Sequence, residues 1–179
     1  MAATRRLLAV SGKRFSGKDT FAAALVEHAR RRGVTLATYA FADQSKRLFV
    51  AEEAQRGVTV DLARLLGDRA YKEQWRPRLT AFTVAAIAAD PLVFCREVVR
   101  RVEASPQAVA MGETPKPPPQ AALITDLRLR IELDHLRSRF ALHVVRVART
   151  DEQRSASGWR RDPAADEHHT ETELDDPAL

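Results

Sequence analysis

The chain of 179 residues carries a formal net charge of +5, contains 6% aromatic residues and has one cysteine, Cys95. This length suits one domain, or a core with a lid; one cysteine excludes an internal disulfide framework, and the basic residues are not interleaved with aromatics as on a nucleic-acid-binding surface. Because no apolar run reaches membrane-spanning length and the N-terminus lacks a signal-peptide pattern, we expect a cytoplasmic protein with neither a membrane nor a nucleic acid as its partner.

A phosphate-binding loop is predicted near the start of the chain. The apolar run at 7–10 predicts a buried strand, and it leads directly into Gly12-x-x-x-x-Gly17-Lys18 and then a helix that ends near Arg32. Glycines let backbone N–H groups curl toward phosphate oxygens, the helix N-terminus adds positive potential, and the lysine reaches the terminal phosphates. The Ser/Thr that commonly follows the lysine is Asp19 here, with Thr20 one place later.

The next segments repeat the order of strand, loop and helix. Residues 34–41 predict a second strand, and 42–47 form a polar loop that enters another helix. This repetition favours a parallel α/β sheet.

A long helical region is predicted at 57–103, broken at Pro77 and at Asp90-Pro91, with Asp90 as the N-cap of the last helix. Cys95 in that helix is expected to be a packed small side chain. The region is large enough to bind a substrate beside the nucleotide core. Residues 104–120 are rich in proline and predict an exposed spacer.

The third strand is predicted at 121–126 and ends in Asp126. The carboxyl end of a parallel strand is where such sheets place their sites, so Asp126 could hold Mg²⁺ through water. The alternative is that Asp126 caps the helix predicted at 131–140, and both roles are compatible. A fourth strand is predicted at 142–148, with His143 on its surface.

The last part of the chain divides into a basic and an acidic stretch. Residues 149–161 contain glycine, arginines and Trp159, which is typical of a lid closing over phosphates. From residue 162 onward there are seven acids and no lysine or arginine, which leaves residues 1–161 with a balance of +12. We expect the acidic tail to be solvated, and the adjacent His168 and His169 make a poor metal site.

Several motifs, in the same order along the chain, resemble the P-loop-type phosphomevalonate kinases. The resemblance begins with the phosphate loop at 11–19 and Tyr71-Lys-Glu73. It continues through Ala89-Asp-Pro-x-x-Phe-Cys-Arg96 and Ile124-Thr-Asp126 with Arg128, and it ends with Arg154-x-x-x-Gly-Trp159 and Glu171-x-x-Leu-Asp175. Gly-Lys-Asp-Thr alone is shared with deoxynucleoside monophosphate kinases.

The resemblance implies an α/β fold: a three-layer P-loop kinase with a parallel sheet of four to five strands flanked by helices. The chain would be a single domain, 1–179, with a core at 1–56 and 121–148, a helical acceptor-binding region at 57–103, and a lid and tail at 149–179. The implied reaction moves the γ-phosphoryl group of ATP, with Mg²⁺, onto the phosphate of phosphomevalonate or of a related small anionic phosphate ester. The expected partner is therefore a phosphorylated small molecule, and we expect a monomer or a weak dimer.

The resemblance also implies the site residues. ATP and Mg²⁺ would be held by Gly12, Ser16, Gly17, Lys18, Asp19 and Thr20, with Arg154 from the lid. The position of Asp126 at a strand end adds it as a second metal-binding carboxylate. The acceptor would be surrounded by Lys13, Arg14, Lys46, Lys72, Arg76, Arg96 and Arg128. The residues expected to act in catalysis are Lys18, Lys13, Arg128 and Arg154.

This sequence departs from the family pattern at four positions that are usually basic, which are Phe15, Ile87, Leu129 and Ser157. Arg130, Arg160 or Arg161 are possible replacements, and the family continues beyond the position of Leu179 with a last strand and helix. Two alternatives stay open: a deoxynucleoside monophosphate kinase, and a nucleotide-binding module with little catalysis.

Overall fold

The computed structural model describes residues 6–104 and 121–176. The chain divides into two compact units, Met1–Tyr39 with Arg101–Leu179, and Ala40–Arg100. The predicted proline-rich spacer lies outside the described residues, apart from Ala104. The division into core, acceptor region and lid stays a prediction.

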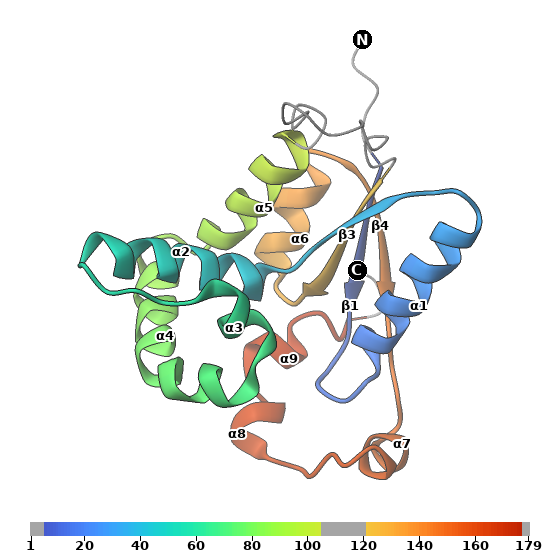
Figure 1. The fold of residues 1–179 in the computed structure, drawn as a ribbon. Helices are drawn as coiled ribbons and strands as arrows, with labels where there is room; N and C mark the ends of the chain where they lie inside the picture. The colour runs from blue at the N-terminus through green and yellow to red at the C-terminus, as the bar shows by residue number, and fades with distance from the viewer. Residues whose placement is uncertain (1–5, 105–120, 177–179) are drawn as a thin grey trace. The chain divides into compact units, whose positions relative to one another are not determined.

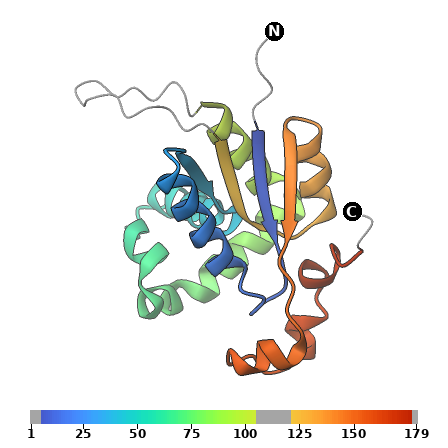
Figure 2. The ribbon, with the colours of Figure 1, turned by 90° about the vertical axis from the view of Figure 1, so that its right-hand side faces the viewer.

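A parallel sheet forms the centre of the first unit (Figure 1). Its strands are β1 (Arg6–Ser11), β2 (Leu36–Tyr39), β3 (Ala121–Leu127) and β4 (Ala141–Arg146), in the order β2-β3-β1-β4. Figure 2 shows β1 between β3 and β4. The predicted α/β class with a parallel sheet is confirmed, and the strand ends differ from the predicted ends by a few residues.

The two central strands are buried because their apolar runs can be covered on both faces. In β1, Leu7, Ala9 and Val10 are buried, and in β3 the buried residues include Leu123 and Ile124. His143 in β4 is exposed, as predicted for a strand surface residue.

Helices cover the two faces of this sheet. The connection from β1 to β2 contains α1 (Lys18–Arg31) and the one from β3 to β4 contains α6 (Arg130–Arg137). These connections run in opposite directions along the sheet, and since parallel crossovers are right-handed, the two helices lie on opposite faces (Figure 1). Ala22 of α1 packs on Val10 and Leu123, which forms a small core under the helix.

Three short helices follow β4, namely α7 (Asp151–Ala156), α8 (Pro163–Asp166) and α9 (His169–Thr172). A capping box between Thr150 and Gln153 begins α7. The prediction of a solvated acidic tail is wrong for Glu171 and Leu174, which are buried.

The second unit is helical, as predicted. It contains α2 (Phe41–Gln55), α3 (Leu62–Gly67), α4 (Arg69–Ala89) and the start of α5 (Val93–Ala104). Phe49, Val60 and Leu65 form its core, and the rings of Trp75 and Phe82 pack on Phe49 with centroid distances of 6.0 and 5.7 Å. Cys95 is buried, as expected.

The predicted loop at 42–47 is wrong, because α2 already begins at Phe41. The buried residues Phe41, Gln44, Ser45 and Phe49 recur at helical spacing, so the polar residues lie on the inner face of a helix. Polar side chains on that face disguised the helical pattern in the sequence.

The predicted break at Pro77 is also wrong, since α4 continues through it. A proline removes the hydrogen bond to the carbonyl four residues earlier, here that of Glu73. Both residues are exposed, so water can satisfy that carbonyl. The predicted break at Asp90 is confirmed, and its carboxylate accepts the Leu92 N–H at 3.0 Å ahead of α5.

Among the described helices, none is long and apolar enough by itself to cross a membrane. Only α4 and α5, taken together as a bent pair, reach the required length and composition.

Candidate active site

The loop between β1 and α1 requires glycine at two positions. Gly12 has φ +153° and Gly17 has φ +87°, both in the region that side chains disfavour. A Cβ atom on Gly12 would lie 2.6 Å from both Ser16 Oγ and the carbonyl oxygen of Val147. The loop therefore folds back on itself and against the end of β4, with no room for a side chain at residue 12.

Phe15 adopts the left-handed conformation without being a glycine, with φ +59°. Such a conformation costs a β-carbon residue about 1 kcal/mol or more. Its side chain is 43% exposed, and the Arg14 guanidinium lies 5.6 Å from its ring centroid. The loop thus holds a strained, exposed aromatic residue at a position where the family that the sequence resembles usually has a basic residue.

The atoms that this loop presents fit an anionic ligand. Ser16 is buried, and its Oγ has no hydrogen-bond partner within the described residues. Gly17 is the N-cap of α1, so the unpaired N–H groups of the first helical turn lie beside Ser16 and Lys18. A buried hydroxyl without a partner is costly, and a phosphate oxygen would supply that partner.

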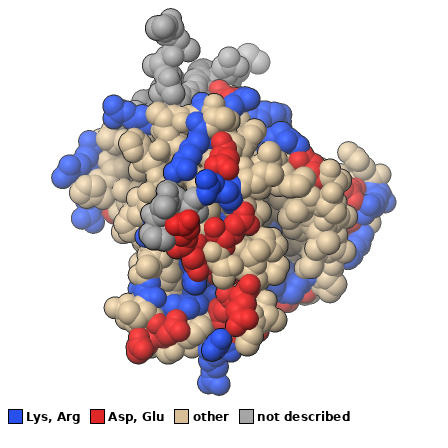
Figure 3. All heavy atoms as spheres, turned by 180° about the vertical axis from the view of Figure 1, so that it is seen from behind, with Lys and Arg blue, Asp and Glu red and all other residues tan. Residues whose placement is uncertain are grey.

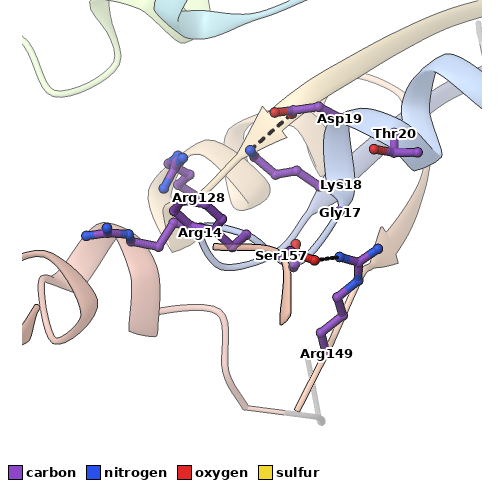
Figure 4. A pocket seen from close by; sticks show the side chains of 10 residues that line it. Arg14, Gly17, Lys18, Asp19, Thr20, Arg128, Arg149 and Ser157 are labelled. Carbon is purple, nitrogen blue, oxygen red and sulfur yellow. Dashed lines mark hydrogen bonds and ion pairs between the residues drawn. The ribbon is translucent and has the colours of Figure 1, made fainter. Parts of the chain in front are cut away.

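A cavity of about 610 Å³ opens beside the loop (Figure 4). Residues from four parts of the first unit line it: Arg14, Phe15, Ser16, Gly17, Lys18, Asp19, Thr20, Arg128, Arg149 and Ser157.

The strand order explains why these residues meet. Because all strands are parallel, the segments that leave β1, β3 and β4 emerge at the same edge of the sheet. β1 lies between the other two, so the phosphate loop has the Arg128 turn on one side and the Arg149 segment on the other. The Val147 N–H donates to the Ser11 carbonyl at 2.9 Å, which continues the β1–β4 pairing up to the loop.

Acids of the C-terminal segment contact cations of the loop itself and of the turn after β3. Lys13 Nζ lies 2.7 Å from Asp175, and Arg128 forms an ion pair with Glu171. Glu171 also accepts the backbone N–H of Arg14. We call Lys13, Arg14 and Arg128 the tail-contacted cations. Figure 3 shows acidic and basic side chains interleaved on the face seen from behind.

Arg14 is held by two further acids of the same segment. Its guanidinium lies 3.8 Å from a carboxylate oxygen of Asp162 and 3.6 Å from one of Asp166. Asp166 also accepts N–H groups from Asp162 and Trp159. Desolvation raises the pKa of Asp166, but these hydrogen bonds and the charges of Arg14 and Arg154 outweigh it and lower that pKa below its ordinary value.

Arg154 is buried under the ring of Trp159, with its guanidinium carbon 4.0 Å from the ring centroid. It donates to the Arg14 carbonyl at 3.2 Å and pairs with Asp151 and Asp166. It is not among the residues that line the cavity. The structure therefore places Arg154 inside the lid segment, and its predicted contact with the nucleotide stays a prediction.

The turn after β3 is closed by Glu132. The carboxylate of Glu132 accepts the N–H groups of Arg128 at 3.1 Å and Leu129 at 3.0 Å. The N-cap residue of α6 is Leu129, so the prediction that Asp126 caps this helix is wrong. Desolvation raises the pKa of Glu132 to about 7, with a smaller contribution from the negative charge of Asp126, although the backbone hydrogen bonds oppose the shift.

Four predicted acceptor residues lie in the second unit. Each occupies a helix, and three have an acidic partner close in sequence: Lys46 with Asp43 at 2.8 Å, Arg76 with Glu73, and Arg96 with Asp90. Lys72 lies in the first turn of α4. Their role in binding the acceptor stays a prediction.

Arg149 is the cavity residue that sequence reasoning missed. It comes three residues after the end of β4, but nothing in the local sequence distinguishes it from the other arginines of the lid segment. The proposed replacements Arg130, Arg160 and Arg161 are absent from the cavity lining; Arg130 pairs with Asp134 and Arg161 with Glu167.

The described residues contain no group of three or more His, Cys, Asp or Glu side chains that could hold a metal ion by itself. Asp19, whose side chain is 82% exposed, and Thr20 line the cavity beside Lys18. This donor set suits a hard cation such as Mg²⁺, which commonly binds through one or two carboxylates together with substrate phosphates.

A glycine loop between the first strand and first helix of a parallel sheet, with cations from three strand ends around it, defines a P-loop kinase fold with a nucleotide site. The family model described as phosphomevalonate kinase matches residues 10–141. The phosphomevalonate kinase of Drosophila melanogaster is 28% identical over 176 residues, which cover 97% of this chain and 83% of that protein. The chain belongs to the phosphomevalonate kinase family.

Proposed function

We propose that the chain uses ATP and Mg²⁺ to phosphorylate phosphomevalonate, a small phosphorylated acceptor. The observation that carries this proposal is the cavity at the phosphate loop, which combines an anion-binding helix N-terminus with Lys18, Arg14 and Arg128 in a member of a kinase family. In the reaction, an oxygen of the acceptor phosphate forms a bond to the γ-phosphorus of ATP. The bond from that phosphorus to the bridging oxygen breaks, and ADP leaves.

The phosphate loop binds and orients the nucleotide. The backbone N–H groups at Gly17 and in the first turn of α1 donate to phosphate oxygens, and Ser16 Oγ gains the partner that it lacks. Lys18, which now lies 3.0 Å from Asp19, turns its ammonium to the terminal phosphates. Positioning and charge neutralisation supply most of the catalysis in phosphoryl transfer.

Three residues, Asp19, Thr20 and Asp126, would hold the metal together with the nucleotide. Bound Mg²⁺ neutralises charge on the phosphates during transfer. When the Lys18 ammonium leaves Asp19 for the nucleotide, the Asp19 carboxylate becomes available to hold the metal.

The acceptor binds to the tail-contacted cations. Lys13, Arg14 and Arg128 bind its phosphate and carboxylate in our proposal, with Lys46, Lys72, Arg76 and Arg96 from the second unit. The carboxylates of Glu171 and Asp175 occupy Arg128 and Lys13 here, so an anionic acceptor exchanges with them. Arg154 belongs to the segment that would close over the phosphates.

A panel assay of ADP release tests the function. Purified protein with ATP and Mg²⁺ is given phosphomevalonate, mevalonate, or each nucleoside and deoxynucleoside monophosphate. We expect turnover with phosphomevalonate alone. Turnover of deoxynucleoside monophosphates alone would identify the other kinase class, and nucleotide binding without any turnover would identify a non-catalytic module.

A further inference from the structure

Arg149 is fixed beside the phosphate loop by the end of β4. The Val147 N–H donates to Ser11, and the Val147 carbonyl lies so close to Gly12 that a Cβ there would be 2.6 Å away. Arg149 follows two residues later, before α7 begins at Asp151. Its backbone position is therefore set by the sheet and not by the lid helix.

The Arg149 side chain lies against the loop. A Cβ on Gly17 would be 3.0 Å from Nη2 of Arg149 and 3.1 Å from its Cζ, so the guanidinium occupies the space that a side chain at residue 17 would fill. Figure 4 shows it reaching the loop beside Gly17 and Ser157. Gly17 is the N-cap of α1, and thus the guanidinium lies next to the N–H groups that bind phosphate.

A hydroxyl orients this guanidinium. Arg149 Nη1 donates to Ser157 Oγ at 2.9 Å, while that hydroxyl donates its own proton to the Gln153 carbonyl at 3.2 Å. Ser157 thereby presents a lone pair to Arg149. The partner is neutral, so the arginine keeps its full charge and most of its five donors.

The charge of Arg149 is uncompensated, unlike that of the other cavity cations. Lys18 pairs with Asp19, Arg14 with Asp162 and Asp166, and Arg128 with Glu171. Within residues 6–104 and 121–176, no carboxylate lies within ion-pair distance of Arg149. A desolvated anion gains most from a cation that does not first have to leave another carboxylate.

We propose that Arg149 binds the β- and γ-phosphates of the nucleotide, as a cation supplied by the end of β4. This inference rests on the proposed nucleotide-dependent kinase function. The planar fork of an arginine matches phosphate oxygens in a way that a lysine does not. Arg149 then replaces the positive charge that is missing at Ser157, a role for which the sequence suggests Arg130, Arg160 or Arg161.

Nucleotide binding tests the proposal directly. Dissociation constants for ATP, ADP and AMP are measured by titration calorimetry with the full chain and Mg²⁺. Arg149→Ala is expected to weaken ATP and ADP binding about 10- to 100-fold, as for the loss of charged hydrogen bonds, and AMP binding far less. Arg32→Ala is the matched control, because this exposed arginine lies beyond the far end of α1, about 20 Å from Gly17. The Arg32→Ala variant should bind ATP with the same affinity as the unchanged protein.

A rescue variant separates position from general charge. Arg149→Ala combined with Ser157→Arg returns a guanidinium to the same corner from the hydrogen-bonded neighbour, and we expect it to recover most of the lost ATP affinity. Arg149→Lys keeps the charge without the fork and should bind ATP with intermediate affinity. Circular dichroism and thermal unfolding confirm that each variant is folded.

The outcomes distinguish this inference from the proposed function. Unchanged ATP and ADP affinity in Arg149→Ala would overturn the role of Arg149, even in a protein that phosphorylates phosphomevalonate. An equal loss for AMP would overturn its assignment to the β- and γ-phosphates. Tight ATP binding that depends on Arg149, without turnover of any acceptor, would support the inference and contradict the kinase function; no nucleotide binding at all would overturn both.

Discussion

The cations around the phosphate loop fall into two groups with different electrostatic surroundings. Among the described residues, Arg149 has a neutral partner, the Ser157 hydroxyl, and Lys18 pairs with its exposed sequence neighbour Asp19. The tail-contacted cations, by contrast, face Asp162, Asp166, Glu171 and Asp175. In the proposed function the nucleotide binds to the first group, which is ready to accept an anion, whereas the acceptor has carboxylates to exchange with at the tail-contacted cations.

The substitution with the largest expected effect is at Lys18. Lys18→Ala removes the cation assigned to the terminal phosphates, and the turnover number should fall about 10²- to 10³-fold. The fold should survive, because within the described residues the ion pair of this lysine is with the exposed Asp19. ADP release and thermal unfolding are measured together, with Arg32→Ala as control; near-normal turnover would remove Lys18 from the mechanism.

The next effect concerns Glu132, whose carboxylate holds the Arg128 turn. Its pKa is raised from 4.5 to about 7 in the folded chain, so the folded state binds the extra proton between these values. Stability is therefore present below pH 4.5 and is lost as the pH rises through 7. Each pH unit is worth about 1.4 kcal/mol, which gives a loss on the order of 3 kcal/mol.

Glu132→Gln keeps an acceptor for the two N–H groups without the charge. Unfolding by urea from pH 4.5 to 8.5 should show a flatter profile for this variant, and the variant should be the more stable protein at pH 8. Parallel profiles for the two proteins would contradict the raised pKa.

A smaller effect distinguishes Arg154 from Arg149. Arg154→Ala should reduce the free energy of unfolding by about 2 kcal/mol, below the full cost of breaking a buried ion pair, because Asp166 keeps donors from Trp159 and Asp162. Arg149→Ala, on an exposed side chain, should change stability by less than about 0.5 kcal/mol. Urea titrations of both variants compare them, and equal stability losses would contradict the contrast.

The smallest expected effect concerns Glu171, the acid that faces the tail-contacted cation Arg128. Glu171→Gln retains an acceptor for the Arg14 N–H but removes the charge that faces Arg128. We expect the KM for phosphomevalonate to fall severalfold and the free energy of unfolding to fall by about 1 kcal/mol. Steady-state kinetics at saturating ATP measures the first quantity. An unchanged or higher KM would mean that Glu171 does not compete with the acceptor.

The elements that the sequence predicted well are those governed by local pattern. The β1 run, the glycine loop and α1 follow each other within 26 residues and need no distant partner to be recognised. The strand pattern around β3 and β4 was equally local. The prediction for the start of α2 was wrong because Gln44 and Ser45 are polar but buried. The prediction of a helix break at Pro77 was wrong because solvent satisfies the freed carbonyl.

The candidate site was predictable only in part, because much of it depends on contacts between distant residues. Glu171 contacts Arg14, which is 157 residues away along the chain, and Arg128, which is 43 residues away. No periodicity or spacing in the sequence predicts such contacts. The burial of Arg154 and the free charge of Arg149 likewise follow from tertiary packing. Lysines and arginines at the loop could be named from the sequence, but their partners could not.

The contact between Trp159 and Asp166 gives the protein an optical reporter. The indole Nε1 donates to both carboxylate oxygens of Asp166, and the Arg154 guanidinium stacks on the ring. Asp166 also faces Arg14, so a ligand that draws Arg14 toward itself alters the polarity around the indole. With Trp75→Phe removing the second tryptophan, the emission wavelength of Trp159 would follow the exchange of tail carboxylates for acceptor in real time, without any attached dye.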